Sequence, residues 1–201
     1  RIVVDAGGHT AGVEVSGGEL IRASVVVMGI GAAPAVGWLE DSGLDLVAPS
    51  EGGGIRCDST LLAAPGVVAA GDVAAWPNSR YGGDVMRVEH WENAIDQGAH
   101  AGRRLLAEID AERWGPPEEF SSVPWFWSDQ YGTKIQMVGR AGEGDEAIVV
   151  EGALDEERFV VLFRRGDRCT AALGLNRPRH VMQVRMAMAD SLVWNDIAGL
   201  F

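Results

Sequence analysis

The stretch that decides the fold reads Gly66-Val67-Val68-Ala69-Ala70-Gly71-Asp72-Val73, followed at residues 90–94 by His-Trp-Glu-Asn-Ala. The apolar run Val67–Ala70 predicts a buried strand, and residues 90–112 predict a long helix. Open α/β sheets bind ligands at the carboxyl ends of their strands, where a carboxylate such as Asp72 suits a sugar or ribityl hydroxyl. A helix N-terminus adds free N–H groups and partial positive charge. The pattern therefore predicts a ligand site at this strand end, although Gly-Asp after an apolar strand is common in α/β proteins.

Upstream of this stretch, short β-favouring runs alternate with pairs of glycines. Gly7-Gly8 and Gly17-Gly18 are typical of hairpin turns, so we expect an antiparallel tail. The continuously apolar Val25–Met28 predicts a strand covered on both faces. It leads into the Gly-rich turn Gly29–Pro34, and a short helix is expected over Ala35–Ser42.

Downstream, Trp114-Gly-Pro-Pro ends the long helix, because proline cannot continue a helix. The Pro-Pro pair with Glu118-Glu119 is the candidate domain boundary. Beyond it the sequence predicts four strands and a last helix, over Lys134–Val138, Ala147–Val150, Phe159–Arg165, Thr170–Leu175 and Arg179–Val193 respectively.

The composition excludes several classes of protein. The chain has 201 residues with 17 Lys and Arg against 29 Asp and Glu, and a net charge of −12 argues against nucleic-acid binding. No apolar run reaches the roughly 18 residues that span a bilayer, so we expect no membrane segment. Cys57 and Cys169 are isolated, which excludes a disulfide scaffold or zinc ribbon and suggests a reducing, cytoplasmic location.

The charges are unevenly distributed. Residues 106–157 hold thirteen acids and three bases, whereas residues 158–190 hold seven arginines and two aspartates. Arg164, Arg165 and Arg168 belong to this basic stretch, which could form a docking surface for an acidic partner. An ordinary solvated sheet face explains it equally well.

Four motifs appear together in a fixed order: Val25–Pro34, Gly66–Val73, His90–Ala94 and Pro124–Tyr131. This series resembles the C-terminal half of the FAD-dependent NAD(P)H–ferredoxin reductases of the putidaredoxin reductase and biphenyl-dioxygenase reductase type. These belong to the pyridine nucleotide–disulfide oxidoreductase superfamily. The resemblance covers essentially the whole chain.

The resemblance implies an α/β FAD-binding segment, partly Rossmann-like, followed by an α+β C-terminal reductase domain with an antiparallel sheet and a C-terminal helix. Residues 1–32 would end an NAD-binding domain, 33–117 would be the second FAD-binding segment, and 118–201 the C-terminal domain. The chain has neither of the family's GxGxxG fingerprints. The missing fingerprints, and a sequence that begins within a predicted strand at Arg1, suggest that the chain is part of a longer protein. We expect the chain to be inactive on its own.

The function implied is transfer of electrons from NAD(P)H through FAD to a [2Fe–2S] ferredoxin that serves an oxygenase or cytochrome P450. The isolated cysteines and a His180 without a nearby Glu provide no dithiol relay or acid/base pair. A rubredoxin or quinone acceptor is an alternative. A non-catalytic docking or dimerisation module is another, and a homodimer is conceivable in either case.

The same resemblance assigns the site residues. Asp72 would bond the ribityl chain of the flavin, with Gly71 allowing close approach. Residues 89–91 would lie beside the isoalloxazine and nicotinamide, and Trp127, the one catalytic candidate, would pack near the flavin ring. His90 could equally be an ordinary surface or core histidine, and Trp125 is expected to be a core or interface aromatic. The cofactor-binding set is Gly29, Gly31, Gly71, Asp72, Glu89, His90, Trp91, Ala94 and Trp127, with no metal ligand.

Overall fold

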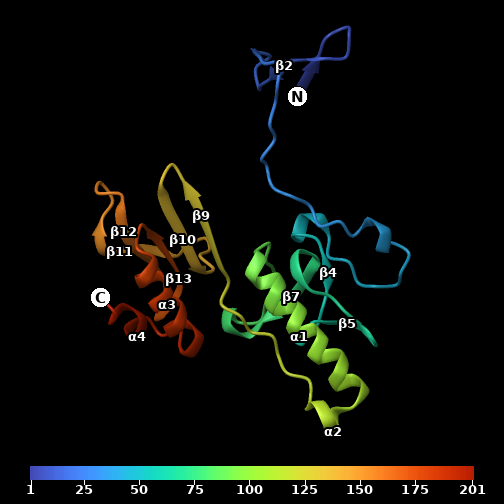
Figure 1. Ribbon diagram of the computed structural model, residues 1–201, viewed down its shortest axis with the longest axis vertical. Helices are drawn as coiled ribbons and strands as arrows, with labels where there is room; N and C mark the ends of the chain where they lie inside the picture. Colours follow the sequence, from blue (N-terminus) through green and yellow to red (C-terminus); the bar gives the residue numbers. More distant parts are fainter. The chain divides into compact units, whose positions relative to one another are not determined.

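The computed structural model describes residues 1–201, which divide into two compact units, 1–33 and 34–201 (Figure 1). The first unit holds an antiparallel sheet in the order β1-β2-β3. Its strands are β1 (Ile2–Val4), β2 (Thr10–Glu14) and β3 (Leu20–Arg22). The connections between them contain the two glycine pairs, so the predicted antiparallel tail is confirmed.

Two predictions for the following segment are wrong. Val25–Met28 forms no strand, and Val27 is 90% exposed. A strand covered on both faces needs neighbouring strands, and no strand of this chain pairs with the segment. The helix expected over Ala35–Ser42 is reduced to one 3₁₀ turn at Gly37–Leu39.

The second unit begins with small sheets and a long helix. The three-stranded sheet has the order β4-β7-β8, with β4 parallel to β7 and β8 antiparallel to it, and a separate hairpin joins β5 to β6. The elements are β4 (Ile55–Arg56), β5 (Leu62–Ala64), β6 (Val67–Val68), β7 (Ala74–Asn78), β8 (Asp84–Arg87), α1 (Trp91–Ile109) and α2 (Ala111–Trp114).

The predicted buried strand Val67–Ala70 also needs correction. Only Val67–Val68 is a strand, Val67 is 40% exposed, and the pairing with β5 is antiparallel. The buried strand lies just after Asp72 instead, where β7 contains the fully buried Trp76. Gly-Asp therefore stands between two strands.

Helix α1 was predicted in the right place, and its buried face is largely polar. Gln97 is fully buried, and the His100 ring nitrogen Nε2 lies 2.9 Å from the Glu118 carbonyl oxygen. The Asn93 amide donates to the Val88 carbonyl at 3.4 Å. These side chains hold loops against the helix, so hydrogen bonds supplement apolar burial here. No helix of the chain combines the length and apolarity needed to cross a membrane.

The carboxyl-terminal part is a five-stranded antiparallel sheet in the order β11-β12-β13-β10-β9, with α3 packed on β10 and β13 (Figure 1). Its elements are β9 (Trp125–Gln130), β10 (Thr133–Gly139), β11 (Glu146–Ala153), β12 (Arg158–Arg165), β13 (Arg168–Leu175), α3 (Pro178–Asp190) and α4 (Trp194–Ala198). The four predicted strands and the helix are present. Strand β9 was missing from the prediction because its aromatic residues were interpreted only as a motif.

Each part of the second unit has its own hydrophobic core, one centred on Trp76 and one on Leu162. The extended chain before β9 runs along β7 and receives its side-chain donors. The Trp76 indole donates to the Phe120 carbonyl at 3.0 Å, and the Asn78 amide donates to the Ser122 carbonyl at 3.0 Å. These buried donors fix the β7 end against the carboxyl-terminal part.

Candidate functional site

Gly71 places backbone directly against helix α1. Its φ is +75°, a left-handed conformation that favours glycine, and a Cβ built there would lie 3.2 Å from the Cβ of Ala94. Its N–H donates to Gln97 Oε1 at 2.7 Å. These two contacts hold the Gly71 segment against the first two turns of helix α1.

The Asp72 carboxylate is exposed, while its backbone is tied down. Arg87 donates from Nη1 to the Asp72 carbonyl and from Nε to the Gly52 carbonyl, both at 2.8 Å. The same guanidinium pairs with Glu89 at 2.7 Å. One arginine thus joins three segments and leaves the Asp72 carboxylate without an ion-pair partner.

The start of α1 presents free backbone donors. The N-cap residue His90 makes no capping hydrogen bond, and its carbonyl accepts from Ala94 N at 3.0 Å. The N–H groups of Trp91, Glu92 and Asn93 consequently have no partner within the helix. With the helix dipole, they favour negative charge at this end.

His90 is half-buried, and its ring lies 4.9 Å from that of Phe126. Burial lowers the pKa of the His90 imidazole, although the neighbouring charges of Asp72 and Glu89 oppose this shift. Its Nδ1 is buried and has no hydrogen-bond partner. We therefore expect a neutral ring with one unused polar atom beside the helix start.

Two stacked tryptophans lie on β9. The rings of Trp125 and Trp127 are 4.7 Å apart at 29°, and Trp127 is 42% exposed. Arg185 on α3 lies 4.9 Å from the Trp125 ring centroid and pairs with Glu92 at 2.6 Å. This arginine connects the tryptophan pair to the first turn of α1.

Replacing Arg185 by alanine is expected to lower the free energy of unfolding by about 1–2 kcal/mol, because both the ion pair and the cation–π contact are partly buried. The near-UV circular dichroism of the tryptophans should change as well. Arg179→Ala, on the same helix, removes an exposed arginine without an ion pair and should alter neither property. Equal effects of the two substitutions would contradict this role.

The structure brings together part of the predicted set. Gly71, Asp72, His90 and Ala94 surround the first turn of α1, flanked by Glu89 and by Trp91, which is 72% exposed. Trp127 joins this group only through Trp125 and Arg185, whereas Phe126 is the β9 residue that contacts His90. Gly29 and Gly31 lie in the first unit, outside regular secondary structure.

Sequence reasoning missed Gln97, Arg87 and Arg185. Gln97 could have been found, because Asn93, Gln97 and His100 recur at helical spacing and place polar side chains on one face of α1. Arg87 and Arg185 contact segments that are distant in the sequence. A local sequence pattern cannot predict such contacts.

Both cysteines are buried and free, and burial raises the pKa of each thiol to about 11. They are therefore protonated near neutral pH and inaccessible to a redox partner. No group of three or more His, Cys, Asp or Glu residues is arranged to hold a metal ion.

The fold and site define a class: an α/β segment with a Gly-Asp turn on a helix N-terminus, followed by an α+β part with its own hydrophobic core. Residues 2–98 match the pyridine nucleotide-disulphide oxidoreductase family, and residues 125–195 match the reductase C-terminal family. The chain belongs to the pyridine nucleotide-disulphide oxidoreductases that carry this C-terminal domain.

Individual relatives agree. The chain is 34% identical to rhodocoxin reductase of Rhodococcus erythropolis, over 93% of this chain and 40% of that protein. It is 36% identical to the ferredoxin–NAD(+) reductase component of the anthranilate 1,2-dioxygenase system of Burkholderia cepacia, over 94% and 43%. The crystal structure of the covalent putidaredoxin reductase–putidaredoxin complex matches with a TM-score of 0.78 and 28% identity, over 94% and 42%. The chain thus spans less than half of each relative.

Proposed function

We propose that this chain, within an intact reductase, forms part of an FAD site and passes electrons from NAD(P)H to a [2Fe–2S] ferredoxin. The observation that carries the proposal is the Gly71–Ala94 contact at the start of α1, where the Gly71 backbone lies against the small Ala94 side chain, next to the free N–H groups of the helix. The names of the relatives support the choice of electron donor and acceptor.

The residues present fit a flavin. Asp72 offers an exposed carboxylate for hydroxyl groups, and the buried polar atoms His90 Nδ1 and Gln97 Nε2 have no partner in the protein. The free N–H groups of α1 would face the pyrimidine edge and stabilise negative charge. Bound FAD would accept a hydride and release single electrons, and the protein would contribute position and electrostatics.

Trp127 is proposed to lie on the electron path between the flavin and the ferredoxin. It is partly exposed, and its stacking on Trp125 fixes the ring orientation. An iron–sulfur protein docked at this surface would meet the ring directly.

The test uses the intact protein under anaerobic conditions. We expect flavin absorption bands, bleaching by NADH or NADPH, and subsequent reduction of a [2Fe–2S] ferredoxin measured by stopped flow. Trp127→Ala should slow the ferredoxin step several-fold and leave bleaching by NAD(P)H unchanged. Trp114→Ala, another partly exposed tryptophan, is the matched control and should change neither step.

The outcomes separate the alternatives. Faster reduction of rubredoxin or a quinone than of any ferredoxin would change the acceptor and keep the flavin site. An intact protein that purifies without flavin and cannot be reconstituted with FAD would leave only a docking or dimerisation module.

A further inference from the structure

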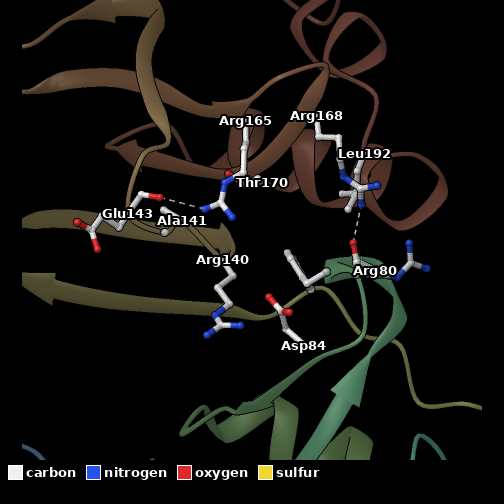
Figure 2. A pocket seen from close by; sticks show the side chains of 12 residues that line it. Arg80, Asp84, Arg140, Ala141, Glu143, Arg165, Arg168, Thr170 and Leu192 are labelled. Carbon is white, nitrogen blue, oxygen red and sulfur yellow. Dashed lines mark hydrogen bonds between the residues drawn. The ribbon is translucent and has the colours of Figure 1, made fainter. Parts of the chain in front are cut away.

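A cavity of about 490 Å³ lies between the β7–β8 hairpin and the carboxyl-terminal sheet (Figure 2). Arginines dominate its lining. Arg80 comes from the hairpin, and Arg140, Arg165 and Arg168 come from the sheet. The cavity is separate from the flavin site proposed above, because none of its lining residues belongs to that site.

One of these arginines is neutralised within the protein. Arg165 pairs with the buried carboxylate of Asp145, which also accepts hydrogen bonds from Thr170 Oγ1 at 2.7 Å and Gly142 N at 2.9 Å. The Arg165 charge therefore stabilises the loop before β11. Because Asp145 neutralises it, Arg165 adds little to the positive electrostatic potential inside the cavity.

The other three arginines have no carboxylate partner. Arg80 donates to the carbonyls of Ser121 at 2.8 Å and Met188 at 3.2 Å, which hold its side chain in place without cancelling its charge. Arg168 donates to the Arg80 carbonyl at 2.6 Å, and the Arg140 side chain forms no hydrogen bond or ion pair, although its backbone N–H donates to the Thr170 carbonyl at 2.8 Å. All three arginines line the same cavity, and like charges gathered there repel one another.

The cavity also holds two exposed carboxylates and a buried hydroxyl. Asp84 and Glu143 line it without forming an ion pair, so the positive charges remain in excess by one. The Tyr81 hydroxyl is buried and has no hydrogen-bond partner. Burial raises the pKa of this phenol, while Arg80 and the other two arginines oppose the shift, so it remains a donor at neutral pH.

We propose that this cavity binds a small oxyanion with two or more negative charges, a phosphate ester or a polycarboxylate, through Arg80, Arg140 and Arg168. Guanidinium groups bind both anions with paired, charge-assisted hydrogen bonds. The volume lies in the range of ligand sites and exceeds what a single phosphate fills. The occupied site would connect the hairpin to the carboxyl-terminal domain.

The test is calorimetric titration of the intact, flavin-loaded protein with inorganic pyrophosphate and, separately, citrate at 0.15 M NaCl without phosphate buffer. We expect one saturable site for at least one of them. Arg140→Gln should weaken binding by about tenfold or more. Because the exposed Arg140 side chain makes no hydrogen bond or ion pair, the fold should be unaffected. Asp84→Asn removes an opposing charge and should tighten binding.

Arg22→Gln is the matched control, since Arg22 is exposed, forms no ion pair and lies in the first unit. Pyrophosphate binding that exceeds citrate binding would indicate a phosphate ester as the natural ligand, and the reverse a polycarboxylate. Binding that survives Arg140→Gln unchanged would place the anion outside this cavity and overturn the proposal. Absence of binding by either anion at 0.15 M NaCl would also overturn it.

Discussion

Replacing Asp145 by alanine is expected to lower the free energy of unfolding by about 3 kcal/mol. The side chain is 1% exposed and accepts from Gly142 N, Thr170 Oγ1 and Arg165 Nε. Alanine would leave the Gly142 N–H and Arg165 Nε without this acceptor, and the buried Thr170 hydroxyl with only the Phe163 carbonyl at 3.3 Å. Urea denaturation of the intact protein, followed by far-UV circular dichroism, measures the loss.

The pH dependence of Asp145→Asn provides an independent check. Burial alone would raise the pKa of the Asp145 carboxyl, but hydrogen bonds from Thr170, Gly142 and Arg165 outweigh burial and lower it. A lowered folded pKa stabilises the protein above the unfolded value of about 3.9, and this stability is lost as pH falls through the folded pKa. The advantage of wild type over the Asn variant should therefore shrink below about pH 4.

Asp129→Ala is the matched control for Asp145. Asp129 also pairs with a base, Lys134, at 2.8 Å, but 60% of its side chain is exposed. Its loss should change stability by less than about 0.5 kcal/mol. Similar losses for both aspartates would mean that burial and hydrogen bonding do not set the contribution of Asp145.

The accuracy of the sequence predictions followed the range of the interactions involved. Strands β10–β13 were predicted from their β-favouring sequences. The prediction is confirmed because each of these strands has a neighbouring strand of the same chain with which to pair. Val25–Met28 has the same apolar character but no pairing strand, and it stays irregular. An apolar sequence pattern indicates that a segment can form a strand, and a neighbouring strand that can pair with it decides whether the strand forms.

The site divides in the same way. Gly71 and Ala94 came from ordered motifs, and their contact is local to one turn and one helix. Arg185 reaches Glu92 across 93 positions of sequence, which no motif encodes. Trp127 was expected near the flavin ring. On β9 it stacks on Trp125, whereas Phe126, which points to the opposite face of the strand, contacts His90.

The basic stretch 158–190 was interpreted either as a docking surface or as an ordinary solvated sheet face, and in the structure its arginines make different contacts. Arg164 stacks on Trp194 at 5.1 Å, Arg165 pairs with Asp145, and Arg168 faces the cavity of Figure 2. Reversing all three charges would damage the loop before β11 as well as any docking. Ferredoxin docking is better tested by single substitutions of exposed arginines.

Gly71→Ala is expected to weaken flavin binding by the intact protein about tenfold or more, a change of at least about 1.4 kcal/mol. An alanine at this position would be held at a positive φ that is strained for any residue with a Cβ. Its Cβ would also lie only 3.2 Å from the Ala94 Cβ, so the turn must move away from α1. This movement would also lengthen the 2.7 Å hydrogen bond from Gly71 N to Gln97. Flavin released on dilution, measured by its fluorescence, reports the affinity.

Gly66→Ala separates backbone strain from contact with the helix. Gly66 has φ +73°, close to that of Gly71, but a Cβ there meets nothing within 4 Å. It should cost about 1 kcal/mol of stability and leave flavin affinity intact. Adding Ala94→Gly to Gly71→Ala removes the clashing atom and should recover part of the affinity. If the double variant binds flavin no better than Gly71→Ala, contact with Ala94 is not what limits the approach of the turn to α1.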